Sequence, residues 1–224
     1  MEIIVVVDVF RAFTTACYVL ENNPKAYYLT NRCAVIQQLS ESVLGPILIG
    51  KPEIGSEVEY TIPNSPTRTL GVDMSNRVVL HRTAAGGSGV LAVAAEKVLA
   101  AGFVNADATV ALIKTLSPSR VRIIPMGHEG TTPSLEDDLC ARYIDGLIKG
   151  KKIDISPFIP ELKKGAGKYF FGKDQEQYPR EDFERCLKLN RFNFAIIAEV
   201  QGDFAILRQS DSVSEEKSNS SISS

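Results

Sequence analysis

The chain lacks any apolar run of the roughly 18–20 residues that a membrane-spanning helix needs. Its apolar start, residues 3–7, is too short for the core of a signal peptide, and Asp8 follows it instead of a small-residue cleavage pattern. The charged residues nearly balance at a net charge of −2, so no basic field predicts binding to nucleic acid or to an acidic membrane. These absences favour a cytoplasmic globular protein with neither a membrane nor a nucleic acid as partner.

Closely spaced cysteines are also absent. Cys17, Cys33, Cys140 and Cys186 lie far apart and form no CxxC pair, so the spacing predicts neither a zinc site nor a disulfide framework. The 224 residues suit one large domain or two small ones, and the hydrophobic share of 44% is that of an ordinary soluble globule. The composition therefore indicates a folded protein of a reducing compartment.

The apolar pattern predicts alternating strands and helices. Residues 2–7 form a continuous β-branched run, which is typical of a parallel strand buried on both faces. Further strands are predicted at 26–30, 47–49, 78–80 and 121–125, and helices at 11–20, 33–42 and 135–148. A glycine-rich turn at 86–89 opens an alanine-rich helix that ends at Gly102, and Asn105 can cap a helix to Leu116. This alternation predicts an α/β fold with a mostly parallel sheet and helices on both faces.

The pattern changes after Gly150. Residues 157–172 are rich in Pro, Gly and Lys and are predicted to be a connector, residues 180–189 a helix, and residues 194–200 and 203–207 a β-hairpin about Gln201-Gly202. Eight of the last 15 residues are serine, which predicts a disordered tail. We therefore expect an α/β core with the acidic site over 1–150, a C-terminal helix and hairpin region completing the fold over 151–209, and a disordered tail over 210–224.

Polar side chains gather where three of the predicted strands end. The carboxyl ends of parallel strands meet at one edge of the sheet, so these side chains are expected to share a crevice. Carboxylates there can hold Mg²⁺, while arginines and the amides of a helix start can bind an anion. The candidates are Asp8, Arg11, Thr14 and Thr15 after the first strand; His81, Arg82 and Thr83 after 78–80; His128, Glu129, Glu136 and Asp137 after 121–125; and Asn64, Ser65, Thr67 and Arg68 at the end of the long loop 50–66.

Structural interpretations compete with these functional ones. Asp8 can cap the first helix, and Glu136 and Asp137 can complement the dipole of the helix that they begin. Glu129 precedes that helix and has no such explanation. Cys140 lies on the apolar stripe of the same helix, where a packed core thiol is the simpler interpretation. The glycine-rich turn lacks the spacing of a P-loop or of a dinucleotide-binding fingerprint.

Six short blocks of the sequence occur in the order found in one known protein family. The blocks are residues 7–15 (VDVFRAFTT), 63–66 (PNSP), 81–86 (HRTAAG), 103–106 (FVNA), 127–130 (GHEG) and 135–141 (LEDDLCA). Together they resemble the 2-phosphosulfolactate phosphatase family over roughly residues 3–208 of the chain. The resemblance implies an α/β fold and a Mg²⁺-dependent hydrolysis of 2-phospho-3-sulfolactate to 3-sulfolactate and phosphate, a step toward coenzyme M.

The resemblance also implies which residues function. It marks Asp8, Arg11, Thr14, Asn64, Ser65, Arg82, Thr83, Glu129, Glu136, Asp137 and Cys140. Two acids that the family carries near the long loop are missing here, where Gly50-Lys51 and Tyr60-Thr61 stand instead. These departures leave open a related phosphatase that acts on another small anionic phosphate ester. A non-catalytic domain that binds a phosphorylated metabolite is the alternative from a different class.

The charges of the implied substrate suggest roles for these residues. It carries phosphate, sulfonate and carboxylate, so its recognition needs several cations and amide donors. We expect catalysis by Asp8, Glu129, Glu136 and Asp137, with Mg²⁺ on Asp8, Glu129 and Asp137, and substrate binding by Arg11, Thr14, Asn64, Ser65, Arg82 and Thr83. Water and a side chain, Asp8 or Cys140, are both open as the nucleophile. A homo-oligomer is equally open.

Overall fold

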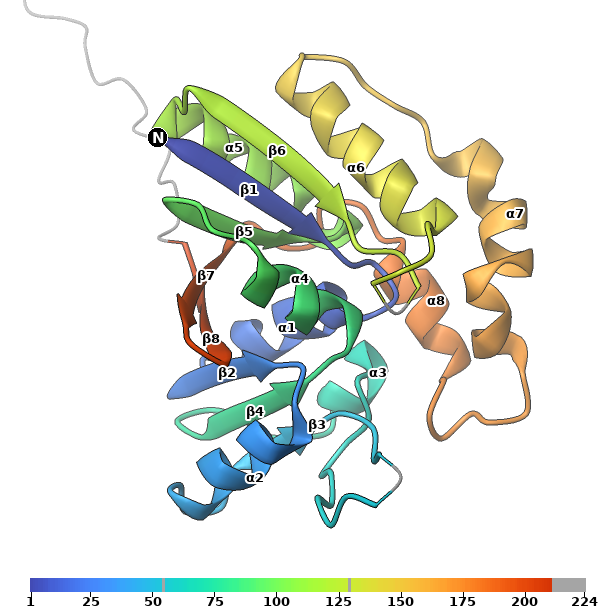
Figure 1. Ribbon diagram of the computed structural model, residues 1–224. Coiled ribbons are helices and arrows are strands. Elements are labelled where there is room, and N and C mark those ends of the chain that lie inside the picture. Colours follow the sequence, from blue (N-terminus) through green and yellow to red (C-terminus); the bar gives the residue numbers. More distant parts are fainter. Residues whose placement is uncertain (54, 129, 211–224) are drawn as a thin grey trace, which may run out of the picture.

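The computed structural model describes residues 1–53, 55–128 and 130–210, and its centre is an eight-stranded sheet in the order β3-β4-β2-β8-β7-β5-β1-β6 (Figure 1). Strand β1 (Glu2–Val7) pairs in parallel with β5 (Lys97–Ala101) and β6 (Arg120–Pro125). Strand β4 (Val78–Arg82) pairs in parallel with β2 (Ala26–Thr30) and β3 (Ile47–Ile49). The predicted α/β fold with a mostly parallel sheet is therefore confirmed.

The C-terminal hairpin joins these two groups of strands. Strands β7 (Ile196–Gln201) and β8 (Phe204–Gln209) pair antiparallel with each other, β7 with β5 and β8 with β2. The hairpin was predicted from its sequence, but its place in the middle of the sheet was not. Figure 1 shows α1 (Ala12–Glu21) and α4 (Ala85–Ala92) between the two strand groups that the hairpin connects.

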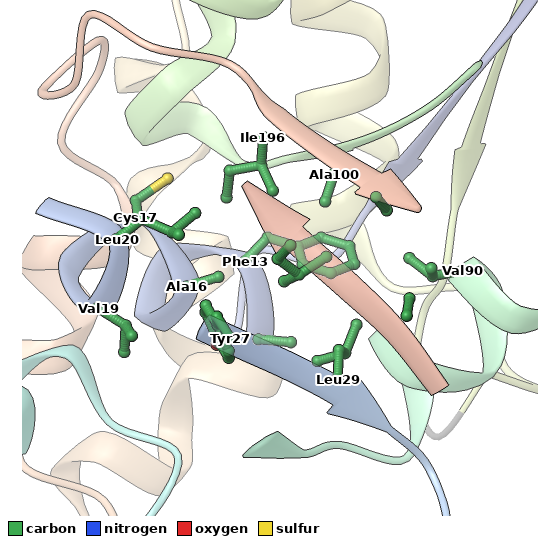
Figure 2. Packing of buried hydrophobic residues seen from close by; sticks show 14 of the residues in the cluster. Phe13, Ala16, Cys17, Val19, Leu20, Tyr27, Leu29, Val90, Ala100 and Ile196 are labelled. Atoms are coloured by element: carbon green, nitrogen blue, oxygen red, sulfur yellow. The ribbon is translucent and has the colours of Figure 1, made fainter. Parts of the chain in front are cut away.

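Strand β1 is buried on both faces, as its continuous apolar run predicts. Ile4 and Val6 belong to a cluster with α1 and the hairpin, whereas Ile3, Val5 and Val7 belong to a second cluster. That second cluster includes residues of α5 (Ala106–Leu116), α6 (Leu135–Ile148) and α8 (Arg180–Cys186). Figure 2 shows the first cluster, with Phe13 of α1 among Tyr27, Leu29, Ala100 and Ile196. Burial on both sides fixes the end of β1, from which Asp8 emerges.

Strand β5 corrects the prediction of one long helix up to Gly102. Helix α4 ends at Ala92, and residues 97–101 form a strand between β1 and β7. Val98, Leu99, Ala100 and Ala101 are all buried, so packing in the centre of the sheet outweighs the helix propensity of alanine.

The remaining helices and turns are short. The predicted connector at 157–172 was wrong, because it contains α7 (Ile159–Lys164) and the 3₁₀ turns η2 (Ser156–Phe158) and η3 (Ala166–Phe171). The helix predicted at 180–189 ends at Cys186. Helices α2 (Cys33–Glu41) and α3 (Pro66–Thr69) and the turn η1 (Phe103–Asn105) complete the set, and the four cysteines are free. In the described ranges no helix has the length and apolarity to cross a membrane. The disordered tail was expected over residues 210–224. Of these, Ser210 is described, and it is buried and hydrogen-bonded to Ala195, so it belongs to the fold; residues 211–224 lie outside the described ones.

Candidate active site

A cavity of about 560 Å³ opens at the carboxyl ends of β1, β4 and β6. This is the edge at which the polar side chains were expected to meet. The ends of these three strands, the long loop and a C-terminal segment contribute to its wall. Its lining includes Asp8, Phe10 and Arg11; Arg82, Thr83, Ala84 and Ala85; Gly127, His128, Glu136 and Asp137; Lys51, Pro52, Glu53 and Asn64; and Ala166, Tyr169, Phe170, Gln177 and Tyr178.

Asp8 lies between two helix starts. Its Oδ1 accepts a hydrogen bond of 3.1 Å from the backbone N–H of Ala12 in α1, and its carboxylate also accepts one from Gly86 N–H in α4. A Cβ at Gly86 would lie 3.0 Å from Asp8 Oδ2 and 2.9 Å from Ala12 Cβ, so glycine permits this close approach. Arg11 is the N-cap residue of the first helix, but Asp8 accepts from the N–H of the first helical residue, so it supports the helix start and also faces the cavity. Burial and the charge of Glu136 raise its pKa to about 6, although these two hydrogen bonds act in the opposite direction.

Asp137 ties two strand ends together. Its Oδ1 accepts from Val9 N–H and its Oδ2 from Gly127 N–H, both at 2.8 Å. Burial, together with the charges of Asp8 and Glu136, raises its pKa well above the ordinary value. Glu136 also has a raised pKa, mainly through burial. Asp8, Glu136 and Asp137 therefore form one group of mutually repelling carboxylates, which we call the acid group.

The negative charge of the acid group suits a cation, although its side chains do not form a complete set of metal ligands. Over residues 1–53, 55–128 and 130–210, no three His, Cys, Asp or Glu side chains are placed to hold a metal ion together. Mg²⁺ does not require such a cage, since it usually binds one or two carboxylates, several waters and the phosphates of the substrate. Asp8 and Asp137, whose pKa values are raised first of all by burial, are the two carboxylates that fit this pattern. Glu129, the third expected ligand, lies outside the described residues.

Cationic side chains face the acid group from the long loop and from β4. Arg82 lies at the end of β4, forms a salt bridge with Glu53, and donates from Nη1 to the carbonyl of Lys51 at 3.3 Å. Lys51 also lines the cavity. The first residues of α4 follow directly, so the positive end of this helix dipole faces the same space. Together these groups form a surface suited to an anion.

Arg11 is held more tightly than the sequence suggested. Its Nη1 donates to Asp182 Oδ2 at 2.8 Å and to the carbonyl of Gln177 at 2.7 Å. Its guanidinium group lies over the rings of Tyr178 and Phe170, at 4.7 and 5.7 Å from their centroids. Arg11 is therefore a buried, paired cation at the cavity wall, and not a solvated helix residue.

Asn64 reaches the cavity, and its Oδ1 is buried without a hydrogen-bond partner among the described residues. Thr83 also lines the cavity. The structure does not bring Thr14 or Ser65 to the wall. Thr14 Oγ1 donates to the carbonyl of Val9, and Ser65 begins α3 by accepting from Arg68 N–H while it donates to Asp182. Asn64 thus keeps a free acceptor for a ligand, whereas Thr14 and Ser65 hold the backbone.

The two other candidate groups lie in the core. His81 is fully buried, and its Nδ1 is 2.6 Å from the hydroxyl of Tyr27. Burial and the charge of Arg11 lower its pKa to about 3, so it is a neutral structural histidine. Cys140 is buried in the second hydrophobic cluster, and burial raises the pKa of its thiol well above the ordinary value. A packed thiol agrees with the structural interpretation of Cys140. His128, in contrast, is exposed at the mouth of the cavity.

This arrangement agrees with what known proteins show. The sequence profile of the 2-phosphosulpholactate phosphatase family matches residues 1–164, which include the acid group and the cationic side of the cavity. The chain belongs to the 2-phosphosulfolactate phosphatase family. Members of this family are phosphoric monoester hydrolases, and the resemblance expected from the six sequence blocks is therefore confirmed.

Individual relatives support the same family over most of the chain. A protein of Bacillus subtilis (strain 168) named "Probable 2-phosphosulfolactate phosphatase" is 29% identical over 215 residues, which cover 94% of this chain and 88% of the relative. A protein of Thermoplasma acidophilum with the same name is 28% identical over 194 residues, or 86% of this chain and 84% of the relative. One from Thermus thermophilus is 31% identical over 131 residues, or 58% of this chain and 54% of the relative.

Sequence reasoning missed three contributors to the site. Asp182 pairs with Arg11 from a position 171 residues away, and nothing in its own neighbourhood marks it. Glu53, two residues after Lys51, is an acid of the long loop that pairs with Arg82 at the site. The aromatic side chains of Tyr169, Phe170 and Tyr178 come from the segment that was taken for a connector and from the stretch after it.

Proposed function

We propose that the chain hydrolyses 2-phospho-3-sulfolactate to 3-sulfolactate and phosphate in the cavity at the edge of the sheet, with Mg²⁺ as its cofactor. One observation carries this proposal: a group of repelling carboxylates faces arginine and lysine side chains across a single cavity. A domain that only bound an anion would gain nothing from three acids beside it, since they would repel the ligand.

The cationic side of the cavity suits a substrate with several negative groups. Arg82 and Lys51 lie near the start of α4, whose backbone amides can donate to phosphate oxygens. Arg11 lines the same cavity, and Asn64 offers a buried free oxygen to a hydroxyl or to an ordered water. Arginine favours planar, two-pronged contacts with phosphate or carboxylate, and this geometry can select among the negative groups.

The acid group supplies charge and protons. Asp8 and Asp137 are the residues that would hold Mg²⁺, together with Glu129 as expected from the sequence. When bound, the ion would polarise the phosphoryl group and offset its charge. The raised pKa of Glu136 lets this carboxyl group hold a proton closer to neutral pH than an ordinary glutamate does. Glu136 is therefore suited to take a proton from the attacking water or to give one to the leaving alkoxide.

A second candidate is hydrolysis of another small anionic phosphate ester. The salt bridge between Arg82 and Glu53 favours it, because this loop acid already neutralises one of the cations that a triply charged substrate would need. A substrate with fewer negative groups would leave that salt bridge in place.

A turnover screen distinguishes these candidates. Phosphate release is measured for 2-phospho-3-sulfolactate and for phospholactate, phosphoglycolate and phosphoglycerate, each with Mg²⁺ and with excess EDTA. We expect Mg²⁺-dependent release with the highest kcat/KM on 2-phospho-3-sulfolactate. A higher kcat/KM on an ester without sulfonate supports the second candidate, and the absence of turnover on the whole panel contradicts both.

A further inference from the structure

One wall of the cavity comes from the C-terminal part of the chain. Ala166, Tyr169, Phe170, Gln177 and Tyr178 form it, and we call these residues the C-terminal wall. They lie beyond residues 1–164, the stretch matched by the family profile, whereas Asp8, Arg82 and Glu136 lie within it. Some contact must therefore fix the C-terminal wall relative to the rest of the site.

Asp182, on α8 directly after the C-terminal wall, makes that contact. Its side chain has no solvent exposure, and both of its oxygens are used. Oδ2 accepts from Arg11 Nη1 at 2.8 Å, while Oδ1 accepts from Ser65 Oγ and from Thr67 N–H, both at 2.9 Å. One carboxylate thus binds the turn after β1 and the segment that follows Asn64.

Arg11 extends this connection into the C-terminal wall. The same Nη1 that binds Asp182 also donates to the carbonyl of Gln177, and the guanidinium plane lies over the ring of Tyr178. Its position therefore depends on Asp182 on one side and on the C-terminal wall on the other. Asp182 does not line the cavity itself, so it can affect a ligand only through Arg11 and the neighbouring segments.

We propose that Asp182 is the positioning residue of this site, which fixes Arg11, the Asn64 segment and the C-terminal wall in one arrangement around the phosphate ester. An ionised carboxylate is suited to the position because it accepts from all three donors at once. An asparagine of the same shape has one oxygen and one NH₂ group. Its NH₂ group would face either the Arg11 guanidinium or the donors of Ser65 and Thr67, and it cannot accept a hydrogen bond from them. The part of this proposal that concerns turnover rests on the proposed function.

The test compares Asp182→Asn with two matched controls. Glu181→Gln removes an exposed carboxylate from the same turn of α8. Ile113→Ala truncates a buried side chain of α5 outside the cavity lining, and it therefore lowers stability without touching the site. Binding of inorganic phosphate is measured by calorimetry in the presence of Mg²⁺. Hydrogen exchange of the amides at 166–178 is measured without any ligand. Both measurements use temperatures at which each variant is folded.

We expect Asp182→Asn to weaken phosphate binding at least tenfold and to speed exchange at 166–178 at least tenfold. Glu181→Gln and Ile113→Ala should change each by less than threefold. Ser65→Ala removes one of the three donors, and it should speed the same exchange by about threefold. This milder variant decides the question if Asp182→Asn does not fold.

The outcomes separate this proposal from the proposed function. Unchanged phosphate binding and unchanged exchange at 166–178 in a folded Asp182→Asn variant overturn the role of Asp182. An equal effect of Ile113→Ala overturns it as well, because the loss would then follow from stability alone. If the wild-type chain hydrolyses no phosphate ester, the proposed function fails, but the exchange experiment still decides whether Asp182 positions the C-terminal wall.

Discussion

Asp8 and Asp182 are both buried aspartates, yet the same substitution to asparagine should change stability in opposite directions. Asp182 is paired with Arg11, so Asp182→Asn leaves a buried cation without its partner and should lower the free energy of unfolding by about 3–5 kcal/mol. Asp8 is buried beside the like charges of Glu136 and Asp137, with Arg11 as a weaker opposing charge, so burial and repulsion both disfavour its ionised form. Removal of the Asp8 charge should therefore stabilise the metal-free protein at neutral pH.

The size of the Asp8 effect follows from its pKa. The unfolded chain titrates Asp8 near the ordinary value of 3.8, and the folded chain at about 6. Between these values the folded state keeps a proton that the unfolded state has lost, so the free energy of unfolding falls as pH rises. The loss is complete above pH 6 and, for roughly two pKa units, amounts to about 3 kcal/mol.

Asparagine does not titrate and avoids this loss, but it accepts fewer hydrogen bonds than a carboxylate. The weaker contacts with Ala12 and Gly86 should cost about 1–2 kcal/mol at every pH. Asp8→Asn should therefore be more stable than wild type by about 1–2 kcal/mol at pH 7.5, with a Tm that rises by roughly 2–8 °C. At pH 4 the advantage is gone, and the variant should be about 1 kcal/mol less stable than wild type.

Denaturant unfolding and thermal scans in EDTA at pH 7.5 and pH 4 measure both variants against wild type. The expected results are a change of sign between the two pH values for Asp8→Asn and a large destabilisation at pH 7.5 for Asp182→Asn. If Asp8→Asn destabilises the protein equally at both pH values, Asp8 is only a helix cap and the reasoning about the acid group is refuted.

Three other substitutions test separate parts of the site. Glu53→Gln should free Arg82 and tighten the binding of inorganic phosphate severalfold. Its Tm should stay unchanged, because the Glu53 side chain is 46% exposed. Weaker phosphate binding would contradict this prediction. Gly86→Ala should lower kcat at least tenfold, because its Cβ would displace Asp8 or Ala12; full activity would show that the close approach is not needed. Cys140→Ala should keep kcat within about threefold of wild type, and the buried thiol should resist thiol reagents at pH 8 in the folded protein. Loss of turnover in a folded Cys140→Ala variant would instead support Cys140 as a nucleophile.

Local patterns predicted the parts of the fold that depend on local sequence. The β-branched run of β1 and the apolar stripe of α6 gave nearly correct boundaries, because burial on both faces or on one stripe is visible in the sequence itself. Strand β5 was missed, since its alanines favour a helix until β1 and β7 pair with it on both sides. The central position of the hairpin depends on pairing with β2 and β5, which lie more than ninety residues earlier, and no local signal carries that information.

In the site, too, some features can be predicted from the local sequence and others depend on tertiary packing. Asp8, Arg82, Glu136 and Asp137 could be predicted to meet, because parallel strands end at one edge and each of these residues lies at or shortly after a strand end. The pairing of Arg11 with Asp182 and of Arg82 with Glu53 could not, since each acid lies in a segment whose course depends on tertiary packing. Thr14 and Ser65 were expected at the substrate, and the structure places their hydroxyl groups on the backbone and on Asp182. Their substrate contacts stay a prediction.

The most direct test of the central claim, that the acid group performs phosphate-ester hydrolysis, is the turnover of Asp8→Asn under conditions where its fold is shown to be intact. Phosphate release from 2-phospho-3-sulfolactate is measured at pH 7.5 with Mg²⁺ for wild type and variant, and thermal unfolding is recorded on the same samples. The account predicts a loss of roughly a hundredfold or more in kcat, the scale of a charge that stabilises a transition state, in a protein whose Tm is not lowered. Wild-type turnover in the Asp8→Asn variant would contradict it.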